Sequence, residues 1–162
     1  MQAKQRDTML VSVYKQNLDN RHNEAEIDSL IAELEGMTKP LTKDSRSDFK
    51  DDIIGKMRGS GWTGKRKIFP STSSITITST KDGIGLCLQL GNIARYYADV
   101  VKLQHLYCTG SISEGVLIVY HMGAAKELFS GGGNLATFER VTKELDLMAQ
   151  SIAFPITVLG VG

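Results

Sequence analysis

The stretch Gly83-Ile-Gly-Leu-Cys-Leu-Gln-Leu-Gly-Asn92 decides how the rest of this sequence is interpreted. Its apolar centre predicts a buried strand, and its last two residues predict the turn that ends the strand. Lys81-Asp82-Gly83, immediately before it, is a tight-turn signal. This turn leads back to residues 74–79, where apolar and hydroxyl side chains alternate as in a half-exposed strand. The region therefore predicts a strand hairpin.

Helix and strand signals continue on both sides of this hairpin. A nearly continuous apolar run at residues 115–120 is typical of a central strand that is covered on both faces. Helical periodicity or strand-like composition marks the other elements, which are a helix around residues 49–57, a short strand at 67–69, helices at 94–107 and 138–152, and a closing strand at 154–160. This order predicts an α/β fold with a mixed central sheet flanked by helices.

The first 45 residues differ from the rest in being polar and mixed in charge. Within them, residues 23–35 place four apolar side chains on one helical face, before Gly36 and Pro40 end the pattern. We therefore divide the chain into a polar N-terminal arm with one amphipathic helix, residues 1–45, and an α/β domain, residues 46–162.

Composition excludes little by itself. The formal net charge of +1 gives no general support for nucleic-acid binding, although it does not exclude binding through a local basic cleft. The two cysteines have no metal-ligand spacing and favour a reducing compartment. The sequence has no apolar run of membrane-spanning length and no signal-peptide core, so we expect a cytoplasmic protein without a membrane partner.

Four features resemble the BglII-like type II restriction endonucleases, which have the PD-(D/E)xK nuclease fold. They occur in the family's order and cover about residues 54–162. The features are the helix end Gly59-Ser-Gly-Trp62, the strand Gly85-Leu-Cys-Leu-Gln-Leu-Gly-Asn92, the step from Ala98-Asp-Val-Val-Lys-Leu103 to Gly115-Val-Leu-Ile-Val119, and the tail from Phe129-Ser-Gly-Gly-Gly133 to Ala153-Phe-Pro-Ile-Thr-Val-Leu-Gly160. The resemblance implies a restriction-endonuclease-like domain.

The same resemblance locates a catalytic site whose metal ligands are replaced. The family pattern places a metal-binding Glu two residues before a Gln, and an Asp nine residues before that Glu. Here the Gln is present as Gln89, but Cys87 stands at the Glu position and Thr78 at the Asp position. Mg²⁺ requires oxygen ligands and carboxylate charge, and thiolate sulfur suits softer metals. We therefore expect neither a bound metal nor another cofactor.

An active Mg²⁺-dependent endonuclease remains an alternative if other carboxylates substitute. Asp82 lies in the turn before the strand, and Asp48, Asp51 and Asp52 lie on the preceding helix. Each also has a simpler interpretation, since Asp is common in turns and acidic residues stabilise helix N-termini. Cys87 is similarly expected to be a buried apolar residue.

A basic cluster gives separate support for DNA binding. Cations neutralise phosphates, and glycines allow backbone amides to approach them. The candidate DNA-binding residues are Lys56, Arg58, Lys65, Arg66, Lys67, Arg95 and Lys102. A glycine triplet at residues 131–133, with Asn134 as the expected helix cap, is a further candidate anion site.

Three functions follow from these patterns. The first is a catalytically degenerate endonuclease-like protein that binds DNA or has a regulatory function. The second is an active Mg²⁺-dependent type II endonuclease that cleaves DNA phosphodiesters with unusual carboxylates. The third is a protein-interaction module, such as an immunity, toxin-neutralising or mobile-element factor. Double-stranded DNA and a protein are thus both candidate partners. A homodimer is expected by resemblance, because two-fold symmetry matches palindromic DNA.

Overall fold

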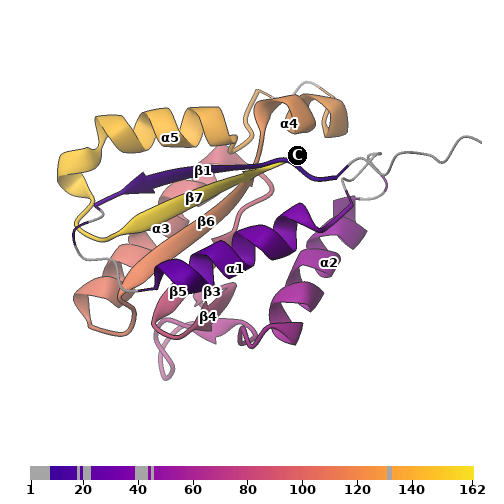
Figure 1. The fold of residues 1–162 in the computed structure, drawn as a ribbon. Helices are drawn as coiled ribbons and strands as arrows, with labels where there is room; N and C mark the ends of the chain where they lie inside the picture. The colour runs from indigo at the N-terminus through magenta and orange to yellow at the C-terminus, as the bar shows by residue number, and fades with distance from the viewer. Residues whose placement is uncertain (1–7, 18, 20–22, 39–43, 45, 131–132) are drawn as a thin grey trace, which may run out of the picture.

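A five-stranded mixed sheet forms the centre of the molecule (Figure 1). The computed structural model describes residues 8–17, 19, 23–38, 44, 46–130 and 133–162. In spatial order the strands are β1 (Val11–Gln16), β7 (Ile156–Val161), β6 (Glu114–Tyr120), β5 (Ile84–Leu88) and β4 (Ser79–Lys81). The three central strands are parallel, and both edge strands run antiparallel to their neighbours. The predicted mixed α/β fold is therefore confirmed.

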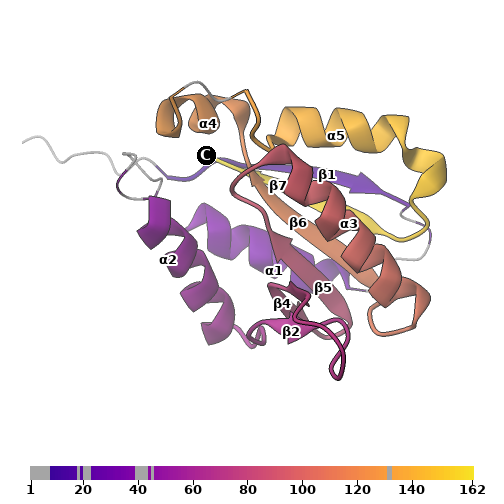
Figure 2. The ribbon, with the colours of Figure 1, turned by 180° about the vertical axis from the view of Figure 1, so that it is seen from behind.

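Helices cover both faces of this sheet (Figures 1 and 2). One face packs against α1 (Glu24–Glu35), α2 (Arg46–Gly59) and α4 (Met122–Leu128). The other packs against α3 (Ile93–Cys108) and α5 (Phe138–Leu147), and the 3-10 helix η3 (Ala149–Ser151) follows α5. The sequence had predicted one helix over residues 138–152, and α4 was not predicted.

Strand β6 shows why both faces need cover. Val116 and Ile118 belong to the core under α1 and α2, whereas Leu117 and Val119 belong to the core under α3 and α5. All seven residues of β6 are buried. Alternation of side chains between two apolar cores explains the continuous apolar run in the sequence, and it confirms the expected central strand.

The N-terminal residues contribute directly to this sheet. Strand β1, which the sequence analysis did not predict, pairs antiparallel with β7 along six residues. The predicted amphipathic helix is present as α1, and it buries Ile27, Leu30 and Leu34 in the core shared with β5 and β6. The stretch set apart as an arm therefore supplies an edge strand and a core helix.

The strand predicted over residues 74–79 is divided in two. Strand β3 (Thr76–Ile77) pairs with β2 (Arg66–Lys67) in a separate two-stranded sheet, whereas β4 pairs with β5. The division falls at Thr78, which donates its backbone N–H to the carbonyl of Leu86 and leaves the β3 ladder. The predicted short strand over residues 67–69 is shifted to Arg66–Lys67.

The expected helix cap at Asn134 is wrong. Helix α5 begins at Phe138, with Thr137 at its N-cap position. Asn134 instead accepts a hydrogen bond from the backbone of Ile93, and Ala136 donates to Gly91, so this segment pairs with the turn after β5. Residues 131 and 132 of the glycine triplet lie outside the described residues.

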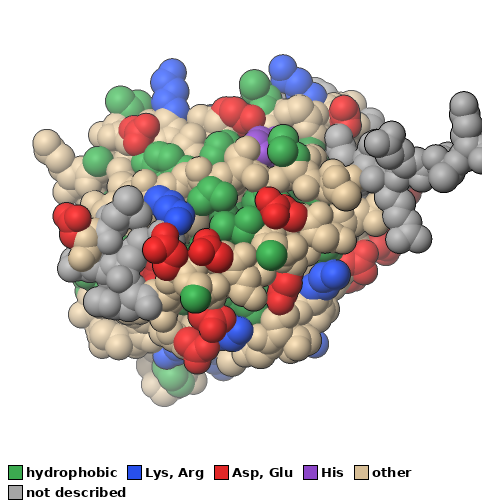
Figure 3. Space-filling view, viewed as in Figure 1, with side chains coloured by type: hydrophobic (Ala, Val, Ile, Leu, Met, Phe, Trp, Pro, Cys, Tyr) green, Lys and Arg blue, Asp and Glu red, His purple; other side chains and the backbone are tan. Residues whose placement is uncertain are grey.

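Acidic side chains gather on the face of the molecule formed by α1 (Figure 3). This helix carries five carboxylates and no Lys or Arg. Among the described residues, no helix is long and apolar enough to cross a membrane.

Candidate functional site

The carboxyl end of β5 lies open because the edge strand beside it is short. Strand β4 pairs only with residues 84–86, so residues 87–89 continue beyond it. The side chain of Thr78 partly completes this edge, since its Oγ1 accepts a 2.9 Å hydrogen bond from the backbone N–H of Leu88. Thr78 and Cys87, which stand at the two positions where the resemblance leads us to expect carboxylates, line one pocket.

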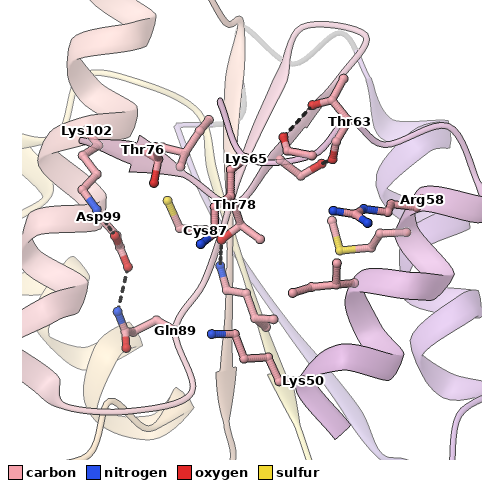
Figure 4. A pocket seen from close by; sticks show the side chains of 16 residues that line it. Lys50, Arg58, Thr63, Lys65, Thr76, Thr78, Cys87, Gln89, Asp99 and Lys102 are labelled. Atoms are coloured by element: carbon pink, nitrogen blue, oxygen red, sulfur yellow. Dashed lines mark hydrogen bonds and ion pairs between the residues drawn. The ribbon is translucent and has the colours of Figure 1, made fainter. Parts of the chain in front are cut away.

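This pocket has a volume of about 340 Å³ and straddles the end of β5, between α2 and α3 (Figure 4). Lys50 and Arg58 reach it from α2, and Asp99 and Lys102 face it from α3 (Figure 4). The remaining lining residues come from α2, from the segment after it and from strands β3 to β5, and they are Ile54, Met57, Thr63, Gly64, Lys65, Thr76, Ile77, Thr78, Ser79, Cys87, Leu88 and Gln89.

Two glycines let α3 lie close over β5 and so bring its side chains to the pocket. Gly85 and Gly115 are direct neighbours in the parallel ladder. A Cβ on Gly85 would lie 3.0 Å from Leu103 of α3, and one on Gly115 would lie 3.1 Å from the same side chain. Side chains at residues 85, 87 and 89 share one face of the strand. Close packing at Gly85 therefore places Asp99, one turn before Leu103, beside Gln89.

A buried hydrogen-bonded group connects the strand to this helix. The side-chain amide of Gln89 donates to Asp99 Oδ2 at 2.9 Å, and Lys102 Nζ lies 2.8 Å from Asp99 Oδ1. Asp99 is only 6% exposed, so its charge requires these partners. Both carboxylate oxygens are thus engaged by protein groups.

The pocket is cationic. Its lining contains Lys50, Arg58, Lys65 and Lys102, and among the residues that the structure describes Asp99 is the one carboxylate that lines it. Despite these cations, the pKa of the Cys87 thiol is raised, first because the group is buried and second because the Asp99 carboxylate is near. Cys87 is therefore a neutral thiol at ordinary pH, and it adds no negative charge to the site.

The donor set does not fit Mg²⁺. A neutral hydroxyl and a neutral thiol stand at the two expected ligand positions, and the single carboxylate is paired with Lys102. Within the described ranges, no group of three or more His, Cys, Asp or Glu side chains is arranged to hold a metal ion.

The structure does not bring the alternative carboxylates to the pocket. Asp82 is an exposed turn residue with a φ of +46°, at the opposite end of β5 from Gln89. Asp51 and Asp52 line a separate surface depression together with Lys56, and Asp48 is exposed on the first turn of α2.

The predicted DNA-binding residues divide into three groups. Arg58, Lys65 and Lys102 line the pocket itself. Arg66 and Lys67 line an adjoining depression that shares Lys65 with the pocket. Lys56 lies beside the acidic residues of α2, and Arg95 is exposed near the start of α3 without lining the pocket.

Sequence reasoning missed two residues of this site. Asp99 has only a weak signal in the sequence, as an acidic residue on a largely apolar helix, three residues before a lysine. Lys50 had no signal, because its position depends on how α2 packs beside the sheet edge.

The family model described as restriction endonuclease BglII/BglIII matches residues 15–161. The chain belongs to this family. The match includes α1, which the resemblance drawn from the sequence had left out.

Solved structures of BglII share the fold of this chain. The crystal structure of BglII complexed with a DNA 16-mer matches with a TM-score of 0.76 and 12% identity, over 94% of this chain and 77% of that one. The crystal structure of free BglII matches with a TM-score of 0.69 and 15% identity, over 93% and 78% of the two chains. No curated protein matches the sequence.

Proposed function

We propose that this chain is a DNA-binding member of the BglII/BglIII family that has lost metal-dependent cleavage. One observation carries the proposal: four cations and a single, already paired carboxylate line the pocket at the end of β5. Lys and Arg side chains neutralise phosphates, so this charge balance suits a nucleic-acid backbone. The related structure of BglII with DNA supports duplex DNA as the partner.

Loss of cleavage follows from the same charges. Metal-dependent cleavage would require carboxylates to hold an ion, which would supply activation of the phosphate and of the attacking water. Thr78 and Cys87 supply no negative charge to attract such an ion, and Lys102 repels it. The pocket is therefore complementary to the anionic phosphate and unsuited to the cation that would activate water beside it.

A homodimer remains part of the proposal. Tyr97 and Val101 lie one turn apart on α3 and are 40% and 68% exposed, which gives this helix an apolar surface for a second copy. Sedimentation equilibrium measures the oligomeric state directly. A monomer at protein concentrations that saturate DNA would contradict the proposed homodimer.

Gel-shift titration of short duplexes in EDTA tests the proposal, with Lys50→Gln/Arg58→Gln as the pocket variant. We expect wild-type binding without metal and a roughly tenfold or larger loss in the variant, because two phosphate contacts are removed. Lys126→Gln/Lys143→Gln is the matched control, since it removes the same charge from exposed positions on α4 and α5. Its affinity should stay close to that of the wild type.

Supercoiled plasmid incubated with Mg²⁺ or Mn²⁺ distinguishes the alternatives. The proposal predicts a bound but intact plasmid. Specific cleavage would establish the active-endonuclease alternative, and absence of any DNA binding would direct the search to a protein partner.

A further inference from the structure

The hairpin made by β2 and β3 stands apart from the central sheet. Its two strands pair through Arg66 with Ile77 and Lys67 with Thr76. The turn between them, residues 68–75, projects at the lower edge of the molecule (Figure 2). The hairpin therefore forms no part of the hydrogen-bond ladder of the central sheet.

The composition around the hairpin suits a polyanion. No Asp or Glu occurs from residue 58 to residue 80, whereas Arg58, Lys65, Arg66 and Lys67 all lie in that segment. The turn itself contains four consecutive hydroxyl residues, 71–74. Hydroxyl groups donate and accept hydrogen bonds, so they can contact both phosphates and base edges.

The hairpin is held in place and presents apolar side chains at its end. Ile68 and Ile77 are buried in the core shared with α3, and the Phe69 ring packs in a tilted arrangement against His105 of α3, with centroids 4.8 Å apart. The backbone N–H of Ile68 donates to the carbonyl of Ile75, which closes the turn. Ile75 itself is 45% exposed. An anchored ribbon loses less conformational entropy on binding than a mobile loop would.

The hairpin is also continuous with the pocket. Thr63, Gly64 and Lys65 line both the pocket and the depression along the hairpin. A polyanion with a phosphate over the pocket would therefore extend along Arg66 and Lys67. Because the pocket and the depression form one continuous surface, they fit a long ligand better than a small one.

We propose that the β2–β3 hairpin enters the major groove of duplex DNA, with its basic residues on the flanking phosphates and residues 71–75 at the base edges. The inference rests on the proposed function and names the surface that would read the duplex. The major groove is wide enough for a two-stranded β-ribbon, hydroxyl side chains can bond to its base edges, and apolar side chains can contact thymine methyl groups. Ile75 and the adjacent hydroxyls provide both kinds of group at the end of the ribbon.

Dimethyl sulfate footprinting shows which groove of the duplex the protein occupies. The reagent methylates guanine N7, which faces the major groove, and adenine N3, which faces the minor groove. We expect the wild-type protein to protect guanine N7 on a bound duplex while adenine N3 stays reactive. Protection of adenine N3 alone would overturn the inference and leave DNA binding intact.

A matched pair of variants assigns the protection to the hairpin. Lys67→Gln/Ile75→Ser removes one cation and one exposed apolar side chain from it, and Lys126→Gln/Leu147→Ser removes the same two groups from α4 and α5, where Leu147 is 79% exposed. We expect the hairpin variant to lose affinity about tenfold and to lose the guanine N7 protection, and the control to keep both.

The outcomes separate the two proposals. A hairpin variant that binds with wild-type affinity and an unchanged footprint overturns the inference but not the proposed function. A wild-type protein that binds no duplex at low salt overturns both. Thermal unfolding of each variant verifies that it is folded, and the wild-type footprint remains a test that needs no variant.

Discussion

Helix α1 and the segment from residue 58 to residue 80 have opposite charge. The helix carries five carboxylates and no Lys or Arg, whereas the segment carries four cations and no carboxylate. A direct connection between the two regions is the hydrogen bond that the Ser60 hydroxyl donates to the Glu33 carboxylate, and Lys81, just after the segment, forms a 2.6 Å ion pair with Glu26. The formal net charge of +1 therefore conceals two separate surfaces of opposite sign.

The difference in charge between the two regions indicates where a polyanion can approach. The acidic face of α1 would repel phosphates, and the pocket and hairpin would attract them, so the field of the protein would orient a duplex before contact. The pocket, which this basic segment helps to line, also lacks the carboxylates that a metal site would need. Charge segregation, and not total charge, is the property that supports DNA binding here.

The largest expected effect comes from placing carboxylates in the basic region. Thr78→Asp/Cys87→Glu would put two acids beside Asp99 in a largely buried site, and without metal we expect a loss of ~3 kcal/mol in unfolding free energy. Mg²⁺ should restore much of it by binding the new oxygen ligands. Isothermal titration calorimetry and thermal unfolding with and without Mg²⁺ measure both effects. A folded double variant that binds no Mg²⁺ would show that the site has been placed wrongly.

Reversing charge at the base of the hairpin should have the next largest effect. Lys65→Glu/Lys67→Glu removes two expected phosphate contacts and adds repulsion, so DNA affinity at low salt should fall about 100-fold. The slope of log affinity against log salt should become shallower by roughly 2. Fluorescence anisotropy with a labelled duplex measures both quantities. Lys126→Glu/Lys143→Glu changes the net charge equally, and an equal loss in that variant would mean that charge location does not matter.

The elements that sequence reasoning predicted are those with dense local signals. Strands β5, β6 and β7 are apolar runs bounded by turns, with Gly83 directly before β5 and Gly91 in the turn that follows it. Strand β1 was missed although Val11 and Val13 alternate with polar residues, because six residues in a polar context give a weak signal for an edge strand.

The grouping of site residues was predictable only within one hairpin. Thr78, Cys87 and Gln89 line one pocket because the hairpin brings their segments side by side. Asp99 and Lys50 depend on how two helices pack beside the sheet edge, which sequence spacing does not encode. The structure places Asp82 at the far end of the same strand, since successive residues of an extended chain advance about 3.3 Å each.

The pH dependence of stability tests whether burial outweighs the surrounding cations at Cys87. The pKa of this thiol is raised in the folded state, so the unfolded chain loses the proton first as pH rises above about 8.5. The thiol's contribution is fully present below that pH and decreases above it, by about 1.4 kcal/mol at pH 9.5. Urea unfolding of wild type and Cys87→Ala at pH 7 and pH 9.5 isolates the difference. Equal pH dependence in the two proteins would mean that the cations offset burial.

Neutralising the acidic helix should have the smallest effect. Asp28→Asn/Glu35→Gln removes two exposed carboxylates from α1, and we expect DNA affinity to rise by only about twofold at low salt and by less at 0.15 M, because distant exposed charges are screened. The same anisotropy assay measures this change. A tenfold increase would place the duplex on α1 and reverse the comparison.

The most direct test of the central claim is wild-type binding to a mixed pool of short labelled duplexes, followed by fluorescence anisotropy in EDTA across a salt series. The account predicts binding without metal, with log affinity falling linearly as log salt rises and a slope that corresponds to several phosphate contacts. Absence of binding at low salt, or binding that appears only when Mg²⁺ is added, would contradict it.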